Sequence, residues 1–282
     1  MKLGLIDVGG GLRDIYGAGV LDMCMDSGVR FDYCIGVSAG SANITSYLSG
    51  QRRRNFKFYY EYSFRREYMG FGNYIKKGSF FDLGYVYGTL SRSDGENPLD
   101  FETMKSNPAG FVIVTSEAES GRVRYFTKDD LAPDRYDPLM ASCAIPVVCE
   151  PYEINGVKYF DGALTDPVPV KKALADGCDK LVLILTKPRE TKRSSIKDDS
   201  LARILHHSYP ISAHNLHLRA KRYNDAVEYA KQLEKEGRLL IVAPDDISGV
   251  DTTKRSKEAL LRLYCKGYAD GGAILPFVNQ AI

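Results

Sequence analysis

The chain has 282 residues, a formal net charge of +2, and apolar and charged fractions of 44% and 26%. Its length suits one large α/β domain or two small ones, and its composition is that of a globular protein with a sizeable core. The nearly balanced charge excludes a global attraction to nucleic acid or to anionic membranes, so any such attraction must be local.

The cysteines and the N-terminus bear on the cellular compartment. Six cysteines are scattered mostly through apolar segments, without a C-x-x-C pair: Cys24, Cys34, Cys143, Cys149, Cys178 and Cys265. They predict reduced core residues, not a disulfide framework or a zinc site. The N-terminus lacks an apolar region of signal-peptide length, and no apolar run is long enough to cross a bilayer. We therefore expect a cytoplasmic protein.

The first part of the chain predicts a β-α-β unit. Apolar runs at residues 3–8 and 31–35 predict buried strands, and residues 15–26 predict a helix that Gly28 ends. A second helix is expected at residues 39–48, directly after the second strand. The crossover between the two strands should be right-handed.

Basic and aromatic residues alternate between residues 51 and 81. The basic residues are Arg52, Arg53, Arg54, Lys57, Arg65, Arg66, Lys76 and Lys77, and the aromatic residues are Phe56, Phe58, Tyr59, Tyr60, Tyr62, Phe64, Tyr68, Phe71 and Tyr74. Such a stretch can contact lipid headgroups or stack on bases, or it can be a helix and loop whose aromatic side chains pack on the core. We expect the packed helix and loop, and weak membrane adsorption through residues 52–77 stays open as the alternative. Nucleic acid is not an expected partner.

The remaining residues alternate predicted strands and helices. Strands are expected at residues 111–115, 122–127, 150–154, 157–160, 180–186 and 238–243. Helices are expected at residues 137–144, 167–176 and 252–267, with two more within residues 200–236. This alternation predicts an α/β fold with a mostly parallel central sheet and helices on both faces. No linker divides the chain, so we expect one domain over residues 1–282, with residues 191–282 packed on a core formed by residues 1–190.

A turn between the second strand and its following helix contains a serine flanked by glycines. The segment Gly36-Val37-Ser38-Ala39-Gly40 has the G-x-S-x-G pattern of a nucleophile elbow, in the strand-to-helix setting that such an elbow requires. Glycine at either flank avoids a collision in the sharp turn, and the serine hydroxyl would lie at a helix N-terminus. A plain Gly-Ser-Gly turn without chemistry is the alternative reading of this motif alone.

Serine-dependent ester hydrolysis also needs a base and hydrogen-bond donors for the oxyanion. The turn Gly9-Gly10-Gly11 follows the first strand and can offer backbone N–H groups, and Arg13 could fix that turn or add positive charge. Taken alone, the turn could equally hold a phosphate, although it is neither a Walker loop nor a Rossmann fingerprint.

The base is expected to be an aspartate and not a histidine. The four histidines lie in the predicted C-terminal helices, where surface or packing roles are expected: His206, His207, His214 and His217. Asp161 lies at the end of a hairpin whose turn is Asn155-Gly156, and Gly162 follows it. Asp161 is therefore the better candidate.

Together, Gly9-Gly10-Gly11-Leu12-Arg13, Gly36-Val37-Ser38-Ala39-Gly40 and Asp161-Gly162-Ala163 resemble the motifs of the patatin-like phospholipase family. The order of the motifs matches, as does the segment Ala141-Ser142-Cys143-Ala144-Ile145-Pro146. The resemblance covers about residues 1–190, and the remainder is similar, on weaker grounds, to the C-terminal part of bacterial members. It implies a three-layer patatin-like fold, a Ser38–Asp161 dyad, an oxyanion hole formed by Gly10, Gly11 and Ala39, and lipid acyl hydrolysis without a metal or cofactor.

One residue departs from the family pattern. Asp14 follows Arg13 at a position where the family usually has glycine. Its charge could weaken the oxyanion loop, or it could be a favourable acid in the first helical turn. We expect the second role.

The resemblance predicts two-step acyl transfer with a fatty-acyl ester as substrate. Asp161 should accept the Ser38 proton from within hydrogen-bond reach, and partial desolvation should raise its pKa. Acyl transfer to an alcohol, thioester hydrolysis, and a lipid-binding module without turnover remain as alternative functions.

Overall fold

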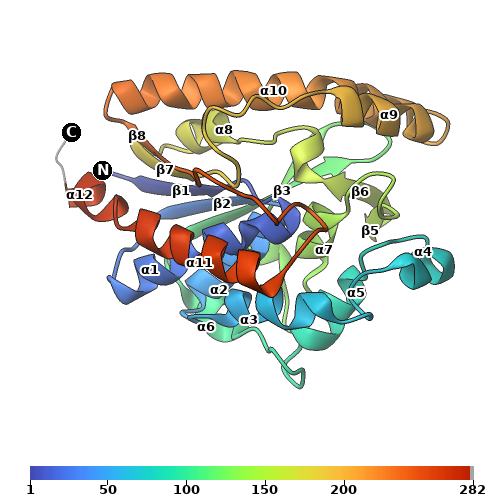
Figure 1. Cartoon of the computed structure of the whole chain (residues 1–282), viewed down its shortest axis with the longest axis horizontal. Helices are drawn as coiled ribbons and strands as arrows, with labels where there is room; N and C mark the ends of the chain where they lie inside the picture. The colour runs from blue at the N-terminus through green and yellow to red at the C-terminus, as the bar shows by residue number, and fades with distance from the viewer. Residues whose placement is uncertain (280–282) are drawn as a thin grey trace.

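A computed structural model describes residues 1–279 and contains one eight-stranded mixed sheet between two layers of helices (Figure 1). The strands are β1 (Leu3–Asp7), β2 (Tyr33–Val37), β3 (Gly110–Glu117), β4 (Val123–Thr127), β5 (Tyr152–Ile154), β6 (Val157–Asp161), β7 (Lys180–Ile184) and β8 (Leu239–Val242). Their order is β5-β6-β3-β2-β1-β7-β8, with β4 also paired to β3. The neighbouring strands β3, β2, β1, β7 and β8 pair in parallel. Strands β4 and β6 pair antiparallel with β3, and β5 pairs antiparallel with β6.

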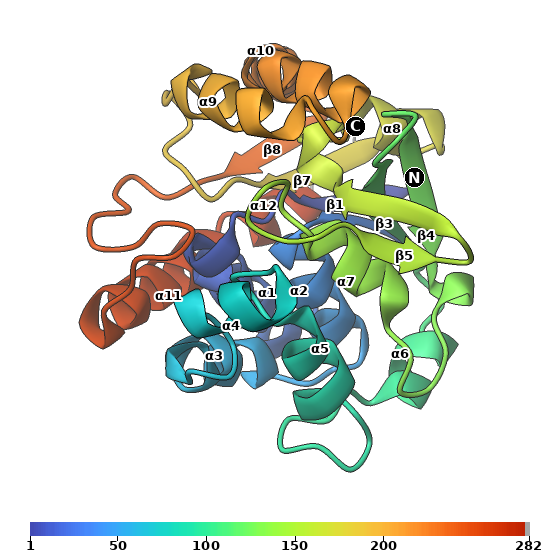
Figure 2. The ribbon, with the colours of Figure 1, turned by 90° about the vertical axis from the view of Figure 1, so that its right-hand side faces the viewer.

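The helices are α1 (Ile15–Asp26), α2 (Ala39–Leu48), α3 (Arg54–Tyr60), α4 (Phe71–Lys77), α5 (Leu83–Tyr85), α6 (Phe101–Ser106), α7 (Asp137–Cys143), α8 (Val170–Ala175), α9 (Ile196–Leu205), α10 (Pro210–Lys235), α11 (Lys257–Gly271) and α12 (Ile274–Asn279). One layer contains α8, α9 and α10, and the other contains α1, α2, α3, α7 and α11 (Figure 2). The prediction of an α/β fold with a mostly parallel sheet and helices on both faces is confirmed.

The central strands are hydrophobic on both faces, as strands between two helical layers must be. All five residues of β1, of β2 and of β7 are buried. Successive side chains point to opposite faces, so Leu5 and Ile6 belong to different hydrophobic clusters, one under α1 and α11 and the other under α8 and α10.

The C-terminal residues are part of the same layers. Strand β8 pairs with β7, and α11 packs closely on α1. Gly19 and Gly267 permit that approach, because a Cβ on Gly267 would lie 2.1 Å from the Tyr16 carbonyl oxygen. The closing helix begins at Lys257, later than the sequence suggested, and α6 was not predicted.

The basic and aromatic stretch divides into two parts in the structure. Tyr59, Tyr62 and Tyr68 are buried, so the packed reading holds for this part. Helix α4, in contrast, leaves Phe71 and Ile75 79% and 83% exposed. In the described part of the chain, no helix has both the length and the apolar composition needed to cross a membrane.

Candidate active site

The sheet places Ser38 and Asp161 at neighbouring positions along β3. Thr115 and Ser116 pair with both β4 and β6, so these two strands lie on opposite edges of β3. Strand β2 pairs with residues of β3 that also pair with β4, so β2 lies on the edge of β3 opposite β4. This is the edge on which β6 lies. Val37, the last residue of β2, is opposite Val114, and Asp161, the last residue of β6, is opposite Thr115. The ends of β2 and β6 therefore meet.

Ser38 lies in a strained turn between β2 and α2. Its backbone has φ 56° and ψ −131°, a conformation that residues with a side chain rarely adopt. The flanking glycines are required by close approach: a Cβ on Gly36 would lie 2.5 Å from the Ser41 Cα, and one on Gly40 would lie 2.4 Å from the Asp7 carbonyl oxygen. This is the geometry of a nucleophile elbow.

A second serine fixes the elbow and was not predicted as a site residue. The Ser38 backbone N–H donates to the Ser142 hydroxyl over 2.9 Å, and that hydroxyl donates to the Val114 carbonyl over 2.7 Å. Ser142 is fully buried in α7. It therefore ties the elbow to β3, and its place in the segment before the hairpin was the sequence signal that could have identified it.

Three hydrogen bonds hold Asp161 in place. Its N–H donates to the Ala144 carbonyl over 2.8 Å, its own carbonyl accepts from the Ser116 hydroxyl over 3.0 Å, and its carboxylate accepts from the Ala163 N–H over 2.8 Å. The residue is only 4% exposed. Burial raises the pKa of the Asp161 carboxyl, while a hydrogen bond with the Ser38 side chain acts in the opposite direction. The expected desolvation of Asp161 is thus present.

The glycine turn after β1 presents its amides without side chains. Gly9, Gly10 and Gly11 have φ values of 66°, 140° and 62°. The Gly9 carbonyl accepts a hydrogen bond from the Thr186 hydroxyl. Among the described residues, the N–H groups of Gly10, Gly11 and Ala39 have no protein acceptor. Gly11 and Ala39 border the same cavity as Ser38.

Arg13 braces this turn from the side of the C-terminal loop. Its guanidinium donates to the Thr252 hydroxyl over 3.2 Å, and the Thr252 carbonyl accepts from the Leu12 N–H over 3.4 Å. Burial lowers the pKa of Arg13. Of the two roles predicted for Arg13, fixing the turn or adding positive charge, these contacts are suited to the first.

Two buried carboxyl groups lie beneath the turn, and sequence reasoning missed their contact. Asp7 and Asp14 are both 0% exposed, and Asn43 donates to the Asp14 carbonyl over 2.8 Å and to the Asp7 carboxyl over 3.4 Å. Burial raises the pKa of Asp7 to about 6. Burial and the neighbouring Asp7 raise the pKa of Asp14 well above its usual value.

The expectation that Asp14 is a first-turn helix acid is therefore only partly correct. It occupies the first turn of a short 3₁₀ helix (Gly11–Asp14) and the position before α1, but its side chain caps neither helix. Two carboxyl groups buried together cannot both ionise cheaply, which is a physical reason for the raised pKa of Asp14 beside Asp7. The Asp7 carboxyl also accepts the Gly9 N–H over 3.1 Å, which couples the pair to the glycine turn.

None of the four histidines lines the cavity beside Ser38. All four are exposed in or beside α9 and α10, and His217 contacts Asp199 over 2.6 Å. In the part of the chain that the structure describes, no cluster of His, Cys, Asp or Glu side chains could hold a metal ion. The six cysteines are free, and four of them are buried as expected: Cys24, Cys34, Cys149 and Cys178. Cys143 is partly buried, and the prediction of a core position is wrong for Cys265, which is exposed.

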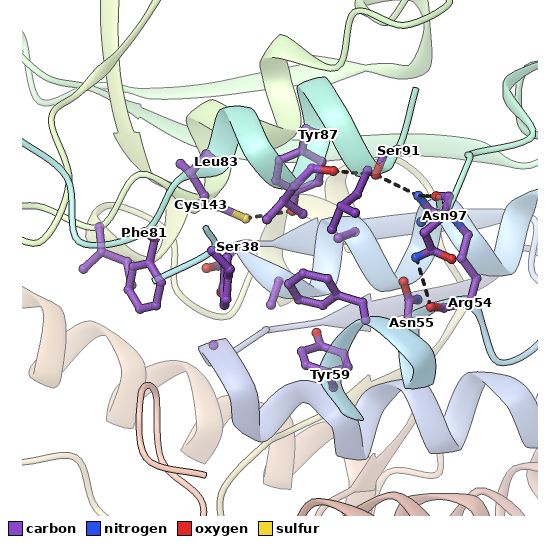
Figure 3. A pocket seen from close by; sticks show the side chains of 18 residues that line it. Ser38, Arg54, Asn55, Tyr59, Phe81, Leu83, Tyr87, Ser91, Asn97 and Cys143 are labelled. Atoms are coloured by element: carbon purple, nitrogen blue, oxygen red, sulfur yellow. Dashed lines mark hydrogen bonds between the residues drawn. The ribbon is translucent and has the colours of Figure 1, made fainter. Parts of the chain in front are cut away.

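A cavity borders Ser38 and has about 730 Å³ of empty space between its lining atoms, counting the part that is open to solvent (Figure 3). Much of its lining is aromatic and aliphatic, including Phe58, Tyr87 and Ile145. Cys143 also borders it, and its thiol contacts the Tyr87 hydroxyl over 3.3 Å. An apolar cavity of this kind suits the hydrocarbon part of an ester.

Comparison with known proteins agrees with this geometry. The family model for patatin-like phospholipases matches residues 8–174, and a model for a domain of unknown function (DUF6363) matches residues 209–281. The uncharacterized protein YjjU of Escherichia coli (strain K12) is 29% identical over 202 residues, which are 67% of this chain and 53% of YjjU. The chain thus spans about half the length of this curated relative.

A solved structure has a related fold. The crystal structure of VipD from Legionella pneumophila superposes with a TM-score of 0.50 at 14% identity, covering 98% of this chain and 67% of that one. At this identity, the likeness concerns the fold alone. Because the family model covers more than half of its residues, the chain belongs to the patatin-like phospholipase family.

Proposed function

We propose that the protein is a lipid acyl hydrolase in which Ser38 and Asp161 form a catalytic dyad. The observation that supports this proposal is the position of Ser38, in a strained elbow at the end of β2, beside the buried Asp161 at the adjoining end of β6. The Ser38 side chain is also among the groups that lower the pKa of the Asp161 carboxyl. Membership of a family of lipid hydrolases supports a fatty-acyl ester as substrate.

The first half of the reaction forms an acyl-enzyme. Asp161 accepts the Ser38 proton while the Ser38 oxygen attacks the ester carbonyl. The N–H groups of Gly10, Gly11 and Ala39 stabilise the tetrahedral oxyanion, since each lacks a protein acceptor among the described residues. The proton then passes from Asp161 to the departing alkoxide, which leaves as an alcohol.

The second half releases the fatty acid. Asp161 removes a proton from water as the water oxygen attacks the acyl carbonyl. The bond between the acyl group and the Ser38 oxygen then breaks, Asp161 returns the proton to that oxygen, and the fatty acid leaves. The raised pKa of Asp161 makes it a stronger base than an exposed aspartate. Gly9, Arg13, Gly36, Gly40 and Gly162 act as supporting positions that shape the elbow, the glycine turn and the hairpin end.

We propose that the protein acts at a lipid surface. The segment that contacts the membrane is shorter than residues 52–77 and is centred on helix α4. Helix α4 exposes Phe71, Tyr74 and Ile75, with Lys76 exposed beside them. Phe71 packs edge-on against Phe80, which packs against the cavity-lining Phe81. An apolar and basic surface that continues to the cavity wall is suited to take a lipid from a membrane. A cytoplasmic location stays a prediction.

The test is a panel of esters from short nitrophenyl esters to phospholipid vesicles, combined with labelling by a fluorophosphonate probe. We expect hydrolysis, and labelling that peptide mass analysis locates at Ser38 and that Ser38→Ala abolishes. A folded protein that neither labels nor hydrolyses any ester would be a lipid-binding module. Product formed mainly from an added alcohol acceptor or a thioester would point to the other two alternatives.

A further inference from the structure

The cavity has one apolar end and one polar end, with Ser38 between them. Phe81 and Leu83 lie on one side of Ser38 in Figure 3. Arg54, Asn97 and Ser91 lie together on the other side. A cavity that served only to hold a plain hydrocarbon chain would have no need of a cation at one end.

Arg54 reaches this end from the first residue of α3, and its contacts are all with neutral groups. Its Nε donates to the Pro98 carbonyl over 3.1 Å and its Nη1 donates to the Ser46 hydroxyl over 3.0 Å. Its Nη2 donates to the Ser91 hydroxyl over 2.8 Å and to the Asn97 carbonyl over 2.9 Å. Of the five N–H bonds of a guanidinium, these contacts use four and leave one on Nη1.

Arg52 and Arg65 differ from Arg54 in having carboxylate partners. Arg52 pairs with Asp26 over 2.5 Å, and Arg65 pairs with Glu96 over 2.8 Å. Among the described residues, no carboxylate forms an ion pair with Arg54. Burial lowers the pKa of Arg54 to about 10, which still leaves the guanidinium charged at neutral pH. The cavity therefore contains a desolvated positive charge without a counter-ion in the protein.

We propose that Arg54 binds an anionic group carried on one arm of the ester, so that the substrate is an amphiphile with an apolar arm and an anionic arm on either side of the scissile bond. The apolar arm lies toward Phe81 and Leu83, and the anion lies against the guanidinium. The inference rests on the proposed function, since it places the scissile ester at Ser38. An anion at this position gains a charge-assisted hydrogen bond from Nη1 and neutralises the buried cation.

Two kinds of ester have this chemistry. The anion can be a phosphate on the departing alcohol, as in an acylated glycerol phosphate. It can instead be a carboxylate at the far end of the acyl chain, as in a dicarboxylic acid monoester. The residues of the polar end recognise the anion and not its source, so substrates must distinguish the two.

The experiment compares kcat/KM within two matched pairs of substrates. One pair is a 1-acylglycerol and the 1-acylglycerol 3-phosphate with the same acyl chain. The other is a nitrophenyl ester of a monocarboxylic acid and the mono-nitrophenyl ester of the dicarboxylic acid of equal length. We expect the wild-type protein to prefer the anionic member of one pair by at least about tenfold, which identifies the arm. Equal rates within both pairs would overturn the proposal.

Variants then assign the preference to Arg54. In Arg54→Met the preference should fall at least about tenfold, whereas Arg54→Lys, which keeps the charge, should retain part of it. Arg65→Met is the matched control, because Arg65 holds the same loop from outside through Glu96 and does not line the cavity. It should leave the preference unchanged.

Other results have defined meanings. An Arg54→Met protein that loses activity equally on both members of each pair would show that Arg54 only supports the loop at residues 91–98, and would overturn the proposal. If Arg54→Met does not fold, the wild-type preference and its retention in Arg54→Lys decide the question. Absence of hydrolysis of every ester, neutral ones included, would instead reject the proposed function.

Discussion

The two walls of the cavity are built in different ways. On one wall, Ser38 and Gly11 line the cavity. These two residues, and Asp161 beside Ser38, are fixed by backbone geometry at the ends of β1, β2 and β6. On the other wall, α3 and the loop at residues 91–98 present side chains, among them the buried cation of Arg54, which has no carboxylate partner among the described residues. The first wall is suited to chemistry that is common to all esters, and the second to choosing among them.

This division gives a general expectation for variants. Changes in the sheet-end wall should lower the rate with every ester, because they alter the reacting groups. Changes in the wall formed by α3 and the loop at residues 91–98 should alter relative rates, and changes in the exposed α4 should alter membrane binding. The largest effects test the first wall.

Ser38→Ala should lower kcat/KM by at least about a thousandfold with every ester in the panel, because the nucleophile is absent. The fold should remain. The backbone strain at φ 56° should also remain, because alanine has a Cβ as serine does. Steady-state kinetics and thermal unfolding measure the two properties. Unchanged hydrolysis would reject Ser38 as the nucleophile, and loss of cooperative unfolding would make it a structural residue.

Asp161→Asn should lower kcat by about a hundredfold to ten-thousandfold, because it removes the general base. The wild-type rate should fall as the pH falls through the raised pKa of Asp161, since only the carboxylate can accept the proton. The residual rate of the variant should lack this step. A pH–rate profile measures it, and an identical acid limb in both proteins would assign the titration to another group. Asp166→Asn provides a control carboxyl whose pKa burial also raises, outside the cavity.

Asp7→Asn should change stability with pH more than it changes chemistry. Burial raises the pKa of Asp7 from 3.8 to about 6, so the folded protein binds more protons than the unfolded chain between these values. Asp7 therefore stabilises the folded state fully below the lower value, and this contribution is lost as the pH rises through the higher one. Relative to wild type, the free energy of unfolding of the variant should gain about 1–3 kcal/mol between pH 3.8 and pH 7.5.

Urea unfolding at the two pH values measures that gain. The exposed Asp94, whose ion pair with Arg92 lies at the surface, is the control position, and Asp94→Asn should show no comparable change. Parallel pH dependences for wild type and Asp7→Asn would mean that Asp7 does not hold the buried proton.

The joint change Phe71→Ser and Ile75→Ser should weaken binding to anionic vesicles by about tenfold or more, since each exposed side chain would contribute about 1 kcal/mol at the interface. Binding should also weaken with salt, by at most about 1 kcal/mol per basic residue. Vesicle co-sedimentation measures both effects. Ile204→Ser is the matched control, because Ile204 on α9 is also well exposed, at 65%, in the other helical layer. Equal losses in both proteins would remove α4 as the contact.

The smallest effect is expected from the histidines. Changing His206, His207, His214 and His217 together to Gln should leave at least about a tenth of the activity, a barrier change of no more than about 1.4 kcal/mol. All four lie in or beside α9 and α10 and away from both cavity walls. A loss of about a thousandfold in a folded protein would favour a Ser–His mechanism over the dyad.

Short-range features of the molecule could be predicted from the sequence. The bounds of α1 and α2, the hairpin at Asn155-Gly156 and the elbow at Ser38 depend on residue types at fixed, short spacing. Backbone sterics explain this: a φ of 56° at Ser38 needs small neighbours at Gly36 and Gly40, and the sequence displays them directly. The α/β class follows from the same alternation of local patterns.

Features that depend on burial were decided only by the tertiary structure. The meeting of Ser38 and Asp161 requires that β2 and β6 share an edge of β3, which no spacing in the sequence specifies. The raised pKa values of Asp7 and Asp14 and the lack of a carboxylate partner for Arg54 depend on which side chains surround a charge once water is removed. Desolvation acts between segments that are distant in the chain, so a charged residue looks the same in the sequence whether it ends on the surface or in the cavity.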